Sequence, residues 1–71
     1  MEFKGPYLFA MREQDPKMFM ELRRSGKMDE HLQEKTEEAY KMLDDLTAKG
    51  TPRREAEEIV RATLIEFPTP E

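Results

Sequence analysis

His31 is the single histidine of the chain and the residue best suited by type to metal binding or acid–base chemistry. Glu34 follows it three residues later, a spacing that places both side chains on one face of a helix. A metal site here requires ligands from a second chain, because one histidine and one carboxylate leave most coordination positions empty. The alternative is a solvated histidine among charged helix residues. We favour the solvated histidine and predict no metal and no cofactor.

Carboxylates are abundant around His31, but their arrangement does not match a catalytic pair. Glu30, Glu34 and Glu38 follow one another at intervals of four residues. A di-iron bundle requires a Glu-x-x-His unit, and Met28 occupies the position where that glutamate would stand. We therefore interpret the acidic run as the solvated face of a helix.

Nucleophilic catalysis has no support in the sequence either. Ser25 and the threonines lack a second histidine that could activate them, and no glycine-rich phosphate loop or zinc pattern is present. The sequence contains no cysteine, which is typical of proteins from reducing compartments. The sequence thus predicts a non-enzymatic protein of the cytoplasm.

Cationic residues form the remaining candidate for binding chemistry. Three lie near the end of one predicted helix and two near the start of another: Arg23, Arg24, Lys27, Arg53 and Arg54. If the helices fold back on one another, these residues form one basic edge that could contact phosphates. The favoured alternative is that the first group neutralises a helix C-terminus, and that Arg54 and Arg61 pair with Glu57 or Glu58 on the same helix. The net charge of −4 argues against nucleic-acid binding by the whole surface.

Prolines and glycines divide the 71 residues into the elements of a single helical domain. Asp15 and Pro16 are suited to begin a helix, which we expect over residues 16–25 with Gly26 as its left-handed cap. Residues 28–49 contain neither glycine nor proline and predict the longest helix.

Gly50 is expected to cap this long helix, and Thr51-Pro52 then opens a last helix over residues 52–66. Residues 67–71 alternate proline with other residues and predict an extended, flexible tail. Residues 1–15 form either a short helix or an extended apolar arm, and we favour the helix.

Apolar side chains recur at helical intervals on the two longest predicted helices. They form a candidate face for self-association or for a partner: Met28, Leu32, Ala39, Tyr40, Leu43, Leu46, Ile59 and Val60. The short connection between these helices predicts antiparallel packing or a right-angle corner. Met18, Phe19 and Leu22 are expected to cover the pair. The predicted fold is all-α, a small bundle of three to four helices with the long central helix packed against the C-terminal helix.

The apolar surface spread over these helices exceeds what so small a core buries. We therefore expect a protein–protein interaction module that forms a homodimer or binds another protein. No stretch approaches the roughly 18 uncharged residues of a membrane span, and no small-molecule site is evident. The alternative function is an accessory nucleic-acid-binding protein that uses the basic edge.

Three segments combine helix caps with regularly spaced apolar residues: FMELRRSGKMDEHLQE at 19–34, EEAYKMLDDL at 37–46 and AEEIVRATLI at 56–65. Together they are similar to the TnpV family, small helical proteins encoded on bacterial transposons and other mobile elements. The resemblance extends over residues 16–65, about two-thirds of the chain. It implies an α-helical fold and a mobile-element context, but it implies neither a biochemical activity nor any functional residue.

Overall fold

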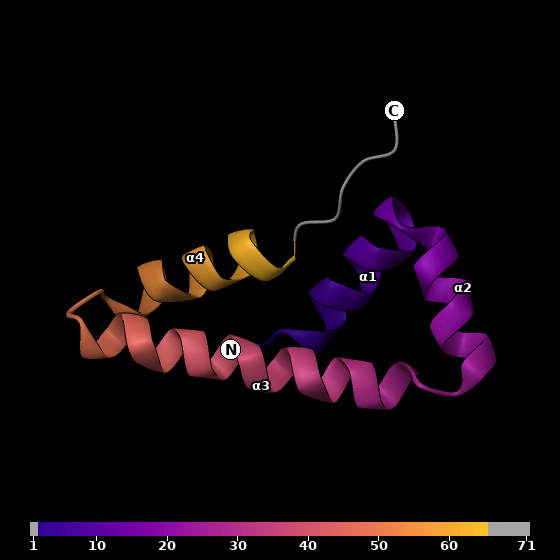
Figure 1. The fold of residues 1–71 in the computed structure, drawn as a ribbon. Helices are drawn as coiled ribbons and strands as arrows, with labels where there is room; N and C mark the ends of the chain where they lie inside the picture. The colour runs from indigo at the N-terminus through magenta and orange to yellow at the C-terminus, as the bar shows by residue number, and fades with distance from the viewer. Residues whose placement is uncertain (1, 66–71) are drawn as a thin grey trace.

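The chain is all-α over residues 2–65, the part that the structure, a computed structural model, describes (Figure 1). Four helices span Lys4–Gln14 (α1), Pro16–Ser25 (α2), Met28–Ala48 (α3) and Arg53–Leu64 (α4). The predicted fold class is therefore confirmed, with α3 as the long central helix packed against α4. The expected tail at 67–71 lies outside the described residues, and α4 ends at Leu64, two residues before the predicted end at Glu66.

The boundary between α1 and α2 follows from the chemistry of two residues. Asp15 precedes α2, and its carboxylate accepts a hydrogen bond from the backbone N–H of Met18 at 3.3 Å. Pro16 is the first residue of α2, where its missing N–H leaves no bond unmade. The predicted N-terminal cap is confirmed. At α4 the proline lies one position earlier, since Pro52 precedes the first helical residue instead of being that residue.

Glycine ends both α2 and α3 in the way that the sequence indicates. Gly26 has φ 75° and Gly50 has φ 96°, a left-handed conformation that side-chain-bearing residues rarely adopt. After each glycine, the next backbone N–H donates to the carbonyl oxygen five residues earlier, at 3.1 and 3.0 Å. This bond satisfies a helix carbonyl that would otherwise lack a partner. Both turns are thereby fixed by local chemistry.

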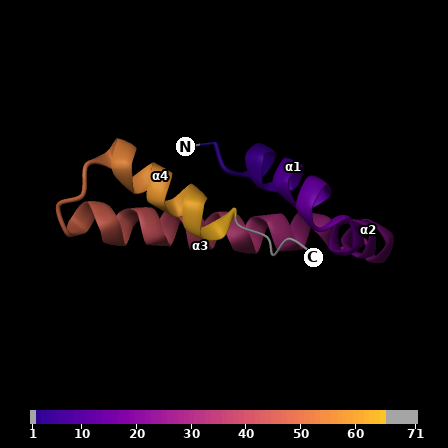
Figure 2. The same cartoon turned by 90° about the horizontal axis from the view of Figure 1, so that it is seen from above.

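The helices form a thin arrangement in which α3 is the base. α4 runs antiparallel along the C-terminal part of α3, so the antiparallel alternative is the one observed (Figure 1). α1 lies on the same side of α3, nearer its N-terminus, and α2 links α1 to the start of α3. Seen from above, α4 and α1 follow one another along α3 (Figure 2). The core therefore lies where α1, α3 and α4 meet.

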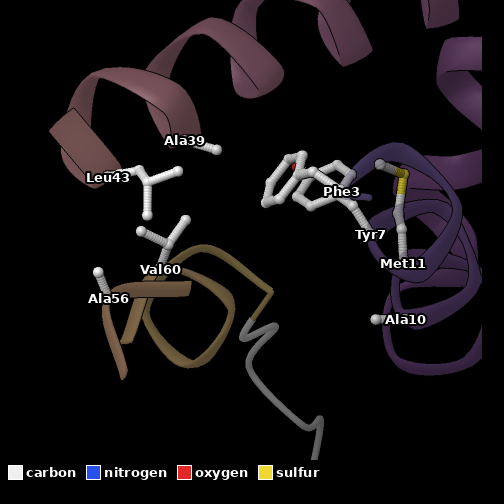
Figure 3. Close-up of a cluster of buried hydrophobic side chains, with 8 residues drawn as sticks. All are labelled: Phe3, Tyr7, Ala10, Met11, Ala39, Leu43, Ala56 and Val60. Carbon is white, nitrogen blue, oxygen red and sulfur yellow. The ribbon is translucent and has the colours of Figure 1, made fainter. Parts of the chain in front are cut away.

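Eight side chains form this core, and half of them come from the first eleven residues (Figure 3). They are Phe3, Tyr7, Ala10, Met11, Ala39, Leu43, Ala56 and Val60. The rings of Phe3 and Tyr7 stack with centroids 5.3 Å apart. The N-terminal segment is thus a helix that supplies the third layer of the core, not an apolar arm.

The expectation that Met18, Phe19 and Leu22 of α2 cover the α3–α4 pair is met only in part, since these residues pack against the core without being fully buried. α2 contains no fully buried residue. The main covering helix is α1, because its Tyr7 and Met11 leave almost no surface in contact with water.

Candidate functional site: a groove between the first two helices

The predicted partner face is mostly occupied by the chain's own helices. Three of its residues are buried in the core: Ala39, Leu43 and Val60. Three more are partly buried against the core: Met28, Leu32 and Leu46. Tyr40 and Ile59 remain exposed, at 40% and 43% of their surface. This apolar pattern therefore serves mainly to hold α3 and α4 together within one chain.

The five cationic residues of the predicted basic edge lie in two separate groups. Arg23, Arg24 and Lys27 lie at the turn from α2 to α3, whereas Arg53 and Arg54 begin α4. These turns stand at opposite ends of α3, whose 21 residues extend about 31 Å (Figure 1). The structure does not bring the groups to one edge.

Within the second group, one arginine pairs with a glutamate on its own helix. The Arg53 Nε atom lies 3.7 Å from Glu57 Oε1. Arg53 is thus a partner of Glu57, whereas the sequence led us to expect Arg54 or Arg61 in that role. The pair follows the i,i+4 spacing that stabilises isolated helices.

His31 is partly buried, which corrects the expectation of a solvated side chain. Its Nε2 lies 2.8 Å from the Tyr7 hydroxyl, and the ring centroids are 5.7 Å apart. Burial raises the pKa of Tyr7, and the negative charge of Glu38 raises it further. The phenol consequently keeps its proton at neutral pH and can donate it to Nε2 of a neutral imidazole. This hydrogen bond ties α1 to α3 and gives His31 a structural role.

An open groove of about 220 Å³ lies between α1 and α2, at the end of the molecule away from α4. Its lining consists of Gly5, Leu8, Phe9, Arg12 and Phe19. The first four recur at intervals of three, one and three residues, which places them on a single face of α1. The core-facing residues of α1 occupy the other side. The helix thus presents apolar surface both inward and outward.

The groove combines an apolar floor with a cationic rim. Phe9 is 67% exposed, the largest value among the large hydrophobic side chains of residues 2–65. On α2, the Arg23 guanidinium lies 5.8 Å from the centroid of the Phe19 ring, which lines the groove. This distance allows a cation–π contact. With Arg12 also in the lining, the groove is suited to an apolar side chain flanked by carboxylates.

Sequence analysis missed Leu8, Phe9 and Arg12 as site residues. A usable signal was present, because apolar residues on both sides of one short helix exceed what its contact with a core requires. The contribution of Phe19 could not be found in this way. It depends on how α2 folds back beside α1, which helical spacing does not determine.

Two classes of site are absent from the part of the chain that the structure describes. No group of three or more His, Asp or Glu side chains there has an arrangement that could hold a metal ion. None of the four described helices combines the length and the apolar character needed to cross a membrane.

Comparison with known proteins leaves the geometry as the basis for functional argument. No protein-family model, curated protein or solved structure gives a significant match to the chain. The resemblance to the TnpV family accordingly stays a prediction from the quoted segments alone.

Proposed function

We propose that the chain is a small, non-enzymatic protein–protein interaction module that self-associates. The observation that carries this proposal is the exposure of Phe9, at 67%, in a groove with Leu8 and Phe19. Aromatic and arginine side chains are enriched at protein interfaces, and an exposed apolar patch with a polar rim is typical of an interaction site. Arg12 lines the groove, and Arg23 lies over the ring of Phe19, another lining residue.

The size of the core also supports self-association. Three of the eight core residues are alanines, which contribute little apolar area: Ala10, Ala39 and Ala56. A chain of this length buries only about 60% of the surface that it exposes when unfolded. Burial of the groove against a second chain would add to a small folding free energy.

The basic edge gives less support to the alternative of nucleic-acid binding, because its residues stand at both ends of α3. A protein that contacts many phosphates binds nucleic acid with strong salt dependence, which would distinguish this alternative from protein association. We therefore keep protein association as the proposed role, in the cytoplasm and in the mobile-element context that the TnpV resemblance implies.

Light scattering as a function of protein concentration tests the proposal directly. We expect the molar mass to rise from that of a monomer to that of a dimer. Phe9→Ala should shift this rise to higher concentration by removing the most exposed aromatic side chain. Met20→Ala is the matched control, since Met20 is also half exposed on a helix but does not line the groove. A wild-type monomer at every concentration would overturn the proposal.

A further inference from the structure

We infer that the groove of one chain receives the outer face of α4 from a second copy, with Ile59 as the inserted side chain. The inference rests on the proposed self-association and adds which two surfaces meet. The helices that line the groove, α1 and α2, lie toward the N-terminal end of α3, whereas α4 packs along its C-terminal part (Figure 1). Two different surfaces of the same chain are therefore paired.

The outer face of α4 has the same helical spacing as the groove face of α1. Its residues are all exposed and recur at intervals of three, one and three: Glu55, Glu58, Ile59 and Ala62. Ile59 is 43% exposed, whereas Ala56 and Val60 of the same helix are buried against α3. The face therefore offers an isoleucine and an alanine beside two carboxylates.

Charge complementarity favours a second copy as the occupant. Within residues 2–65, ion pairs join Lys35 to Glu38 and Arg53 to Glu57. Neither Arg12 in the groove nor Glu58 on α4 takes part in these pairs, so both remain available to another chain. An arginine and a carboxylate that meet at an interface form strong, geometrically specific hydrogen bonds.

The distribution of charge along the chain points the same way. Residues 2–27 contain six cationic and four acidic side chains, whereas residues 28–65 contain six cationic and ten acidic ones. Contact between the first part of one copy and the last part of another therefore brings opposite net charges together. Such complementarity accelerates encounter and fixes the register of an interface.

A two-fold axis allows both contacts to form at once. In a symmetric dimer each chain contributes one groove and one α4 face, so the same pairing occurs twice. The assembly then closes at two chains. A single head-to-tail contact without this symmetry would continue into longer assemblies.

Charge reversal with mixing of variants tests this pairing. In the Arg12→Glu homodimer, two carboxylates would oppose each other at both contacts, and in the Glu58→Arg homodimer two guanidinium groups would meet. Each variant alone should dimerise about tenfold more weakly, because the symmetry applies every substitution twice. Mixed in equal amounts, the two variants should recover dimerisation. In the mixed dimer, one contact keeps the original arginine and glutamate, and the other has the same two charges exchanged. Both contacts therefore join opposite charges. Analytical ultracentrifugation of each variant and of the mixture measures this.

The controls separate the inference from the proposed function. Arg24→Glu, on α2 outside the groove lining, should leave the wild-type dissociation constant unchanged. If wild type dimerises but the mixture does not recover, the surface pairing is wrong and self-association still stands. Growth of the wild-type mass beyond two chains would overturn the closed two-fold arrangement. A wild-type monomer would overturn both the pairing and the proposed function.

Discussion

In the α3–α4 hairpin each helix directs one apolar stripe toward its neighbour, whereas α1 carries apolar side chains on two opposite faces. Ala39 and Leu43 of α3 meet Val60 of α4 in the core (Figure 3). In α1, Met11 points into the same core while Phe9 lies in the open groove. In the hairpin, folding buries most of each stripe and leaves Ile59 of α4 exposed. A helix with two stripes has a second face left for binding, which is why the candidate site lies at the α1–α2 corner.

The strongest test of this contrast is a charge in the hairpin. Leu43 is 2% exposed, so Leu43→Asp would place a carboxylate in the apolar core. The expected cost is several kcal/mol, comparable with the whole stability of so small a domain. We expect circular dichroism to show an unfolded or weakly cooperative chain at about 25 °C. Glu34→Ala, at an exposed position on the same helix, should keep the wild-type melting midpoint. An unchanged midpoint for Leu43→Asp would remove Leu43 from the core.

The next test asks whether α1 is as necessary as the hairpin. Met11 is fully buried, and Met11→Ala should lower the free energy of unfolding by about 2–5 kcal/mol. Met20→Ala is the matched control, because Met20 is 50% exposed on α2. Urea denaturation followed by circular dichroism measures both variants. Equal and small losses would mean that the first helix is dispensable, as an extended arm would be.

The two regions differ in how far sequence could predict them. The hairpin depends on local features, such as the left-handed Gly50 in its turn, and on one apolar stripe per helix. These features act over short distances along the chain, so spacing and residue type suffice. Residues 1–15 contain no single stripe, and their spacing leaves the choice between a helix and an arm open.

The site was harder to predict for a related reason. The groove joins Phe9 and Arg12 of α1 to Phe19 of α2, and the core contact of Tyr7 with His31 spans 24 residues of sequence. Such contacts depend on how helices meet in space. Ile59 is an instructive case, since its stripe position predicts a contact surface and the structure leaves it partly exposed.

A smaller effect on stability is expected at the hydrogen bond between Tyr7 of α1 and His31 of α3. Tyr7→Phe removes the hydroxyl that lies 2.8 Å from His31 Nε2, which should cost about 0.5–1.5 kcal/mol at neutral pH. Burial and Glu38 raise the pKa of Tyr7, so the unfolded chain releases this proton at lower pH than the folded chain. The stabilisation is therefore fully present below about pH 10 and is lost as the pH rises through the folded-state pKa.

Urea denaturation between about pH 8 and 11 measures this effect, since that range spans the ordinary pKa of a phenol. Wild type should lose stability more steeply above about pH 10 than Tyr7→Phe does. Tyr40→Phe changes the other, more exposed tyrosine and should retain the steep wild-type decline. Parallel curves for wild type and Tyr7→Phe would show that the phenol of Tyr7 does not link α1 to α3 in the way described.

The smallest predicted effects on stability concern two glycines, Gly5 near the start of α1 and Gly26 at the end of α2. Gly5 lies in the first turn of α1, and a Cβ built there meets only the flexible end of the Glu2 side chain, at 2.8 Å from Oε1. Gly5→Ala should therefore raise the free energy of unfolding by up to about 1 kcal/mol, since alanine favours helix more than glycine. Gly26→Ala should lower it by about the same amount, because Gly26 has φ 75°. Thermal unfolding of both variants checks these opposite signs. A loss of stability in Gly5→Ala would contradict the expectation that alanine is accommodated in the first turn of α1.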